Sequence, residues 1–202
     1  MSLLPTALNF GPFSEHIRFL MEIDKLKSVS RRTRLLNKGR YENSAEHSWH
    51  FAMAAMALEQ WKPEGCDIQR VIRMALLHDI VEVDVGDVLV YDISARTDIA
   101  EKEAAAARRL FGLLPEPLSS EFLALWQEYE HKESADARFA NAIDRLLPVI
   151  QNLHNEGQSW QENNIALAQV LSRNSEVAAC VPELWEHIVA ELHLAQQRGW
   201  LR

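Results

Sequence analysis

Residues that form turns are scarce in this chain, and their scarcity limits the folds open to it. The 202 residues include only seven glycines and seven prolines, well below average usage. A sandwich or barrel of short strands needs a turn about every 8–12 residues. Apolar residues instead recur with helical spacing along most of the chain. We therefore expect an all-α fold.

The clearest helical pattern follows Asp67, whose side chain can cap a helix. The apolar residues after it fall on a single stripe: Ile68, Val71, Ile72, Ala75 and Leu76. Similar spacing predicts helices over residues 14–26, 99–111, 117–130, 135–154, 164–172 and 182–197. Another should begin at Ser44 and end before Pro63. The basic stretch from 31 to 40 and residues 83–87 are expected to form loops, and Pro148 is expected to break the helix over 135–154.

The chain contains no internal repeat and no long linker. We therefore expect a single-domain helical bundle over residues 1–202. Its core should span about residues 14–155, and the helices of 156–202 should pack on that core.

The net charge, the apolar runs and the cysteines limit the binding partners and the cellular compartment that we expect. The net charge of −8 argues against a nucleic acid polymer, because binding its backbone normally needs a basic face. No apolar run approaches the roughly 18 residues of a membrane span, so we expect no membrane partner. Cys66 and Cys180 show no CxxC spacing, and no secretory signal pattern is present. A reduced, cytoplasmic setting is expected.

Three of the expected helices place metal-binding residue types on faces that should point inward. The apolar stripe after Asp67 predicts that positions 79 and 82 face inward, and Asp79 and Glu82 stand there beside His78. His47 lies one turn before an apolar residue on its own helix, and Asp144 shares a face with apolar neighbours. A carboxylate on an apolar stripe is costly unless it is paired or bound to a metal.

Each of these residues alone has a simpler interpretation. A single histidine such as His47, or the His78–Asp79 pair, is more often hydrogen-bonded in a core. Asp144 could pair with a nearby arginine, Arg145 or Arg138. Two histidines and two aspartates from three helices, however, match the ligands of a borderline divalent cation. The combination favours a metal site.

The end of the helix that carries these residues is unusually acidic. Glu82, Asp84 and Asp87 crowd its C-terminus, where negative charge normally destabilises a helix. A bound cation would offset this charge. For Asp84 a solvated loop position is an equally good interpretation.

Three segments resemble the HD-domain phosphohydrolases. The order His47, His78–Asp79, Asp144 matches the family's H…HD…D signature. The flanking residues are RYENSAEHS at 40–48, LHDIVE at 77–82 with GD at 86–87, and FANAIDRL at 139–146. These segments are similar to the bacterial 5′-deoxynucleotidase subfamily and its eukaryotic HD-domain homologues. The similarity covers roughly residues 14–155.

This resemblance implies a helical HD fold and a role for each matching residue. The family's four metal-ligand positions fall on His47, His78, Asp79 and Asp144. Glu82 falls on the position that orients or deprotonates the attacking water, and Asp87 on a second acidic position in the pocket. Arg32 falls on a phosphate-contacting arginine, although Arg31 and Arg34 fit a shifted register. Thr33 stands where some members carry a tryptophan against the sugar, which leaves open the choice between ribose and deoxyribose.

The resemblance also implies cofactor, partner and reaction. We expect one divalent ion, with Mn, Co, Fe, Ni, Zn and Mg all compatible with the ligands, and a homodimer, since family members commonly dimerise. The expected activity is that of a metal-dependent 5′-(deoxy)nucleotidase, which hydrolyses nucleoside 5′-monophosphates to nucleoside and phosphate through a metal-activated water.

Two other functions stay open. An HD-type hydrolase could act on an alarmone, a cyclic nucleotide or a pyrophosphate, but we find no additional histidine cluster and no long insertion. A non-catalytic nucleotide-binding module could hold a structural metal. The acidic residues at 82 and 87 argue against it, because a structural site needs neither.

Overall fold

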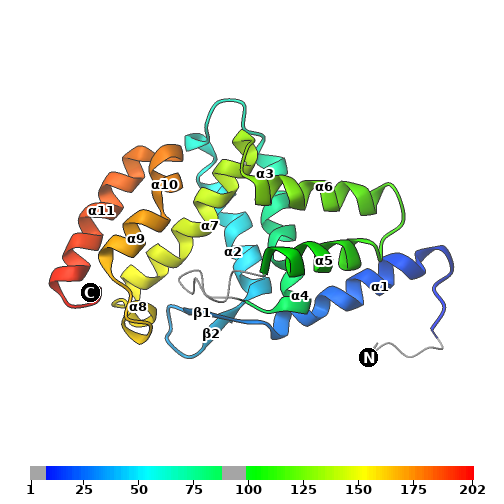
Figure 1. Cartoon of the computed structure of the whole chain (residues 1–202), viewed down its shortest axis with the longest axis horizontal. Helices are drawn as coiled ribbons and strands as arrows, with labels where there is room; N and C mark the ends of the chain where they lie inside the picture. The colour runs from blue at the N-terminus through cyan, green and yellow to red at the C-terminus, as the bar shows by residue number, and fades with distance from the viewer. Residues whose placement is uncertain (1–7, 88–98) are drawn as a thin grey trace.

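The computed structural model describes residues 8–87 and 99–202. Helices make up most of these residues, and the strands found there form a single two-stranded hairpin (Figure 1). The all-α class is therefore confirmed. The α-helices are α1 Ser14–Ile23, α2 Ser44–Ala57, α3 Ile68–Leu77, α4 Glu82–Val85, α5 Ile99–Phe111, α6 Leu118–His131, α7 Ala135–His154, α8 Gln158–Glu162, α9 Leu167–Arg173, α10 Ser175–Cys180 and α11 Pro182–Gln197.

Shorter elements join these helices. The antiparallel strands are β1 Ser30–Arg34 and β2 Tyr41–Asn43. The 3₁₀ helices are η1 Gly11–Phe13, η2 Asp24–Ser28, η3 Glu59–Trp61 and η4 His78–Val81. Within the described ranges, no helix is both long and apolar enough to cross a membrane.

Helix α7 is the centre of the fold. It contacts α2, α3 and α6 on one side and α8, α10 and α11 on the other. Its 20 residues give a length of about 30 Å. Phe139 and Ile143 on α7 are fully buried with Phe51 of α2 and Met74 of α3. These apolar side chains form the part of the core that lies beneath the site.

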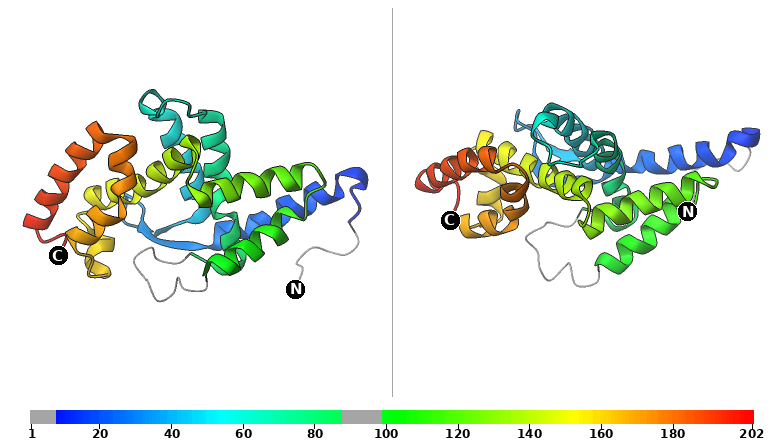
Figure 2. Two further views of the ribbon diagram at one scale, coloured as in Figure 1. Left: turned by 45° about the horizontal axis from the view of Figure 1, so that its top comes forward. Right: turned by 90° about the horizontal axis from the view of Figure 1, so that it is seen from above.

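Helices lie at two opposite ends of the molecule, beyond the central α2, α3 and α7. Figure 2 shows α1, α5 and α6 extending to one side and α9 to α11 to the other. Helices α5 and α6 pack on each other, and α5 also contacts η4. The segment from α8 onward contacts α7 and β1, so it closes one side of the site.

Pro148 does not break α7, contrary to the expectation from the sequence. A proline within a helix removes the hydrogen bond to the carbonyl four residues earlier, here that of Asp144. Tight packing of the helix compensates, since Leu147 and Val149 on either side are buried.

The basic stretch expected to be a loop forms part of the β1–β2 hairpin, so that expectation was wrong for residues 31–34, which lie in β1, and right for residues 35–40, which connect the strands. Thr33 is buried between the exposed Arg32 and the half-buried Arg34, and Glu42 is buried in β2. The buried residues of the hairpin are polar, so the usual alternation of apolar and polar residues is missing.

Helix α2 begins with a capping box in which Asn43, rather than Ser44, is the N-cap. The Asn43 side chain accepts a hydrogen bond from the Glu46 N–H at 2.9 Å, and Glu46 accepts one from the Asn43 N–H at 3.0 Å. Ser44 is therefore free to make a different contact within the site.

Helix α3 changes geometry where the chemically important residues begin. Asp67 caps α3 as expected, by accepting from the Gln69 N–H. The α-helix ends at Leu77 and continues as η4, and residues 82–85 then form the single turn α4. The expectation of a loop over 83–87 was wrong for most of that segment. Trp126 Nε1 donates to the His78 carbonyl at 3.2 Å, which helps to hold the tighter turn in place.

Candidate metal centre and its pocket

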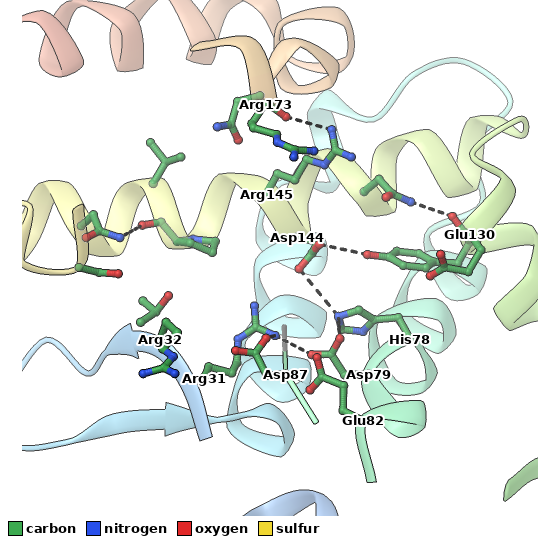
Figure 3. Close-up of a pocket in the computed structure, with 18 of the residues that line it drawn as sticks. Arg31, Arg32, His78, Asp79, Glu82, Asp87, Glu130, Asp144, Arg145 and Arg173 are labelled. Atoms are coloured by element: carbon green, nitrogen blue, oxygen red, sulfur yellow. Dashed lines mark hydrogen bonds and ion pairs between the residues drawn. The ribbon is translucent and has the colours of Figure 1, made fainter. Parts of the chain in front are cut away.

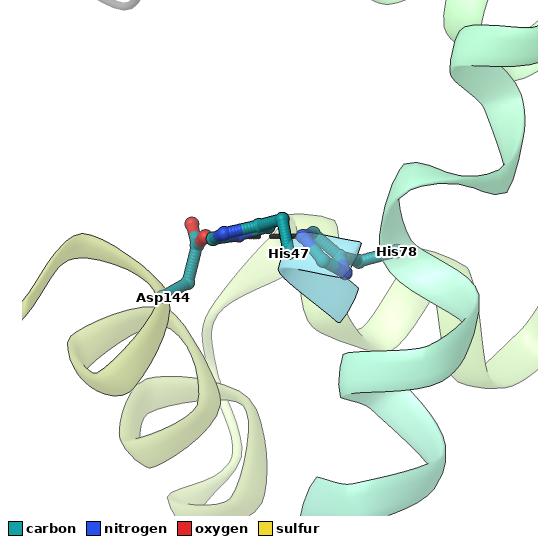
Figure 4. A group of neighbouring side chains, drawn as sticks. All are labelled: His47, His78 and Asp144. Atoms are coloured by element: carbon teal, nitrogen blue, oxygen red, sulfur yellow. Dashed lines mark hydrogen bonds and ion pairs between the residues drawn. The ribbon is translucent and has the colours of Figure 1, made fainter. Parts of the chain in front are cut away.

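Two histidines and one aspartate converge beside α7 (Figure 4). His47 comes from α2, His78 opens η4, and Asp144 lies on α7. Each offers a ligand atom, and these atoms all lie within 4.8 Å of one another. His47 Nε2 is 2.8 Å and His78 Nε2 is 3.8 Å from the same Asp144 oxygen, Oδ1. Both histidines are buried and Asp144 is half-buried.

The hydrogen bonds around His78 fit a cation at this point. The Nδ1–H of His78 donates to the Ala75 carbonyl at 2.9 Å, which leaves Nε2 as an acceptor in the neutral ring. Yet His78 Nε2 is buried without a hydrogen-bond partner among the described residues and faces Asp79 Oδ1 at 2.9 Å and Asp144 Oδ1. Acceptors that face one another need a proton or a metal ion between them, so the residues present fit a divalent ion.

The pKa shifts of His78 and Asp144 also fit a cation at this point. Burial lowers the pKa of His78, but the charge and hydrogen bond of Asp79 and the charge of Asp144 together outweigh burial and raise this pKa to about 9. Burial also opposes ionisation of Asp144, but the hydrogen bond from His47 and the neighbouring cationic groups hold the pKa of this carboxyl well below its usual range. The site therefore favours positive charge between the imidazoles and carboxylates.

Asp79 stands at the edge of this cluster. Its Oδ1 faces His78 Nε2, while its Oδ2 accepts a hydrogen bond of 2.8 Å from Arg31 Nη1. Only one of its two oxygens is therefore turned toward the histidines.

Glu82 and Asp87 line the same pocket as the histidine and aspartates (Figure 3). Ser44 Oγ donates a short hydrogen bond to Glu82 Oε2. Burial, and then the charge of Asp79, raise the pKa of Glu82 to about 9. Burial also raises the pKa of Asp87. In the metal-free pocket these shifts favour the protonated form of both carboxyls, whereas a bound cation would favour the ionised form.

Arg31 is the arginine that contacts the carboxylates. Besides its bond to Asp79, its Nε lies 3.5 Å from Glu42 Oε1 and its Nη1 lies 4.0 Å from Asp87 Oδ1. Arg32 is exposed and also lines the pocket. Within the described part of the chain, no carboxylate lies within 4.0 Å of Arg32. Its guanidinium is therefore available to a ligand.

The structure also places Thr33 and tests whether Asp144 pairs with a nearby arginine. Thr33 is buried and lines the pocket next to Arg32. Asp144 does not pair with Arg145 or Arg138 in the described structure: Arg145 pairs with Glu176 at 3.1 Å, and Arg138 donates to the Glu133 carbonyl.

Two residues of the site were missed by sequence reasoning. Glu42 Oε1 lies 3.6 Å from His47 Nδ1, and Gln151 Nε2 donates to Glu42 Oε2 at 3.1 Å. Tyr129 OH donates to Asp144 Oδ2 at 3.1 Å. Tyr129 follows the buried Trp126 by three positions on α6, so helical spacing could have placed it inward. Glu42 lies in a polar stretch with no such signal.

The pocket holds a cavity of about 250 Å³. Sites for small molecules typically measure about 300–1,000 Å³, so this cavity suits a small ligand and not a polymer. Helix α7 contributes much of its wall. The residues of α7 that line it are Asn141, Asp144, Arg145, Pro148, Val149 and Asn152.

Known proteins resemble this chain in sequence and in structure. The HD domain model matches residues 23–185. A 5′-deoxynucleotidase HDDC2 from Xenopus laevis is 34% identical over 141 residues, which cover 69% of each chain. A 5′-deoxynucleotidase from Erwinia tasmaniensis is 31% identical and covers 68% of this chain and 74% of its own.

The structural likeness extends further along the chain. A crystal structure described as a predicted metal-dependent phosphohydrolase from Magnetospirillum magnetotacticum MS-1 matches with a TM-score of 0.88 at 44% identity. The match covers 94% of this chain and 95% of that chain. Together with the family model, which spans more than half of the residues, this places the chain in the HD domain family.

Proposed function

We propose that this chain is a metal-dependent phosphomonoester hydrolase that releases phosphate from nucleoside 5′-monophosphates. The observation that carries the proposal is the position of Glu82 in the same small pocket as His78 and Asp144, which converge with His47. A carboxyl with a raised pKa next to a metal-binding cluster suits water activation. Relatives named 5′-deoxynucleotidase support the nucleotide as the substrate class.

The ion would be held by His47, His78 and Asp144, with Asp79 as the fourth ligand. A divalent ion bound there supplies Lewis acidity and a water of lowered pKa. The tautomer of His78 is fixed by its bond to Ala75, which keeps the lone pair of Nε2 directed at the ligand position.

The protein's carboxyls would then move the protons. Glu82 accepts a proton from the attacking water as the bond between its oxygen and phosphorus forms. The bond from phosphorus to the 5′ oxygen breaks, and the leaving oxygen takes up a proton. Asp87, whose pKa is raised by burial, is placed to donate that proton.

The two arginines of β1 would have different tasks. Arg31, held by Asp79 and Glu42, positions the carboxylates. Arg32 lines the pocket without an ion pair to any described carboxylate and would bind the phosphate oxygens, for which its fork geometry is well suited. Thr33, buried beside it, would face the sugar.

Phosphate release from a panel of compounds tests the proposal. The panel contains 5′- and 3′-mononucleotides, cyclic nucleotides, a pyrophosphate and an alarmone, with metal-stripped protein reloaded with Mn, Co, Zn or Mg. We expect metal-dependent turnover of the 5′-monophosphates, lost in Asp79→Ala and Glu82→Ala. Turnover of another class alone would favour the alternative hydrolase. Metal binding with no turnover would leave a binding module. The ratio of dAMP to AMP turnover reports on sugar selection.

We also propose a homodimer and a cytoplasmic setting. Trp49, Met53 and Met56 lie on one face of α2 and are exposed, which suits a contact with a second copy. Light scattering after gel filtration should give twice the mass of 23.1 kDa, and Trp49→Arg should reduce the dimer to a monomer.

The state of the cysteines supports the cytoplasmic setting. Cys66 and Cys180 are both free, which suits a reducing compartment. Fractionation of cells that express the tagged chain tests the compartment.

A further inference from the structure

The pocket contains a second set of charged side chains, apart from those that face the metal centre. Lys132 follows α6, Arg145 comes directly after Asp144 on α7, and Arg173 ends α9. Figure 3 shows the side chains of Arg145 and Arg173 beside each other, on the side of Asp144 away from Arg31 and Arg32. We call Lys132, Arg145 and Arg173 the cationic cluster.

The cluster has fewer carboxylate partners than cations. Arg145 Nη1 donates to the Arg173 carbonyl at 3.0 Å and lies 3.1 Å from Glu176 Oε2. In the described ranges, neither Lys132 nor Arg173 has a carboxylate within 4.0 Å. Among the described residues, Glu176 therefore lies at ion-pair distance from Arg145 alone of the three, while Glu176 and Glu130 act on Lys132 from farther away.

This crowding has an electrostatic cost. Burial, and next the charge of Arg145, lower the pKa of Lys132. Like charges in a partly desolvated pocket repel one another, and a bound anion would relieve the repulsion. The cluster is held in place by the backbone, because Lys132 adopts a left-handed conformation at the end of α6 and Arg145 is tied to the end of α9.

We propose that Lys132, Arg145 and Arg173 bind a second phosphate group, separate from the one that reacts at the metal centre. The proposal rests on the proposed function, since it extends the substrate to nucleotides that carry two phosphates. All three side chains are hydrogen-bond donors without acceptor atoms, which suits phosphate oxygens better than the mixed donors and acceptors of a base edge. The second phosphate can belong to the substrate or be a separate inorganic ion.

A second phosphate on the substrate fits the layout of α7. Asp144 and Arg145 are consecutive, so their side chains leave the helix about 100° apart. The metal centre and the cationic cluster therefore face different parts of one pocket. A nucleoside 3′,5′-bisphosphate can place its two phosphates in these two parts.

Kinetics with matched substrates provide the first test. The metal-loaded full chain is given a nucleoside 5′-monophosphate and the 3′,5′-bisphosphate of the same nucleoside, and release of the 5′ phosphate is followed. We expect a KM at least about tenfold lower for the bisphosphate, because charge-assisted contacts are strong. Arg173→Gln should abolish this preference and Arg173→Lys should keep most of it. The control Arg108→Gln, exposed on α5 and outside the pocket, should leave it unchanged.

Two kinetic results would argue against the proposal. Equal loss of kcat/KM for both substrates in Arg173→Gln would mean that the cluster holds the reacting phosphate. Equal KM values in the wild type would exclude a second phosphate on the substrate, and calorimetry with inorganic phosphate then decides whether a separate ion binds. We expect one more phosphate per chain in the wild type and Arg108→Gln than in Arg173→Gln.

The binding data separate the two proposals. Phosphate binding that depends on Arg173, without turnover of any monophosphate, would contradict the proposed function and leave the anion site standing. Turnover of monophosphates with neither a bisphosphate preference nor binding that depends on Arg173 would overturn the anion site alone.

Discussion

Arg31 Nη1 donates a hydrogen bond of 2.8 Å to Asp79 Oδ2 and thereby holds one oxygen of a predicted metal ligand away from the histidines. The same guanidinium reaches Glu42 and Asp87. Arg31 is thus the cation around which three carboxylates of the site are arranged. In a buried ion-pair network of this kind, loss of one member leaves the others uncompensated.

Arg31→Met should therefore destabilise the fold by about 3 kcal/mol. Urea unfolding measures the change. Arg34→Met, on the same strand, is the matched control. Arg34 pairs with Glu162 nearer the surface, so its loss should cost about 1 kcal/mol or less. Similar losses in the two variants would contradict the central role of Arg31.

Glu82→Gln should reduce activity and yet stabilise the metal-free protein at neutral pH. Removal of a general base typically lowers the rate by about 10²–10⁴. The folded-state pKa of about 9 exceeds the ordinary value of 4.5, so the stability that goes with the protonated carboxyl is fully present below about pH 4.5. It is lost as the pH rises toward 9. Melting temperatures of chelated protein between pH 5 and 9 should therefore show a growing advantage for Gln. An advantage that shrinks with pH would contradict the raised pKa.

Metal binding should release protons at pH 7. Without metal, the pKa of His78 is about 9, so its imidazole is protonated at this pH and must lose the proton to become a ligand. Calorimetric titration with Zn²⁺ in buffers of different ionisation enthalpy should show at least one proton released per ion. Affinity should fall as the pH decreases. His47→Ala should abolish the binding, and a heat that is independent of the buffer would refute the assignment.

Glu42 should tune the metal site through His47. Its carboxylate faces His47 Nδ1 at 3.6 Å, so it would favour the tautomer with the proton on Nδ1, which leaves Nε2 to a bound metal ion. Loss of such an outer partner typically lowers metal affinity about 10–100-fold. Glu42→Gln should show this loss in competition with a chromogenic chelator, and the absorption spectrum of bound Co²⁺ should shift. Glu162→Gln, at the exposed end of α8, should bind metal as the wild type does.

Where apolar spacing was strong, the sequence predicted the structure well. The helices α7 and α11 begin and end where their periodicity indicated, and Asp67 caps α3 as expected. Inward positions for His47, Asp79 and Asp144 were expected from the same spacing, with His78 beside Asp79, and the structure brings His47, His78 and Asp144 together. The resemblance to the HD family rested instead on the signature residues and the segments around them.

The misses have a common physical cause. The β1–β2 hairpin buries Thr33 and Glu42 against a polar site, so no apolar pattern marked its strands. The change from α3 to η4 depends on contacts from a distant helix, such as the bond from Trp126 to the His78 carbonyl. Arg31 could not be distinguished from Arg32 because the direction of each side chain depends on the hairpin.

Helix α7 continues past Pro148 without a break, so one continuous helix lines this side of the pocket. From Asn141 to Asn152 it runs along the pocket for about 16 Å as one rigid rod. The spacing of the pocket residues that α7 itself contributes is therefore set by helical rise. On the proposed function, a different spacing between Asp144 and the contacts farther along α7 would require insertion or deletion of residues in this helix.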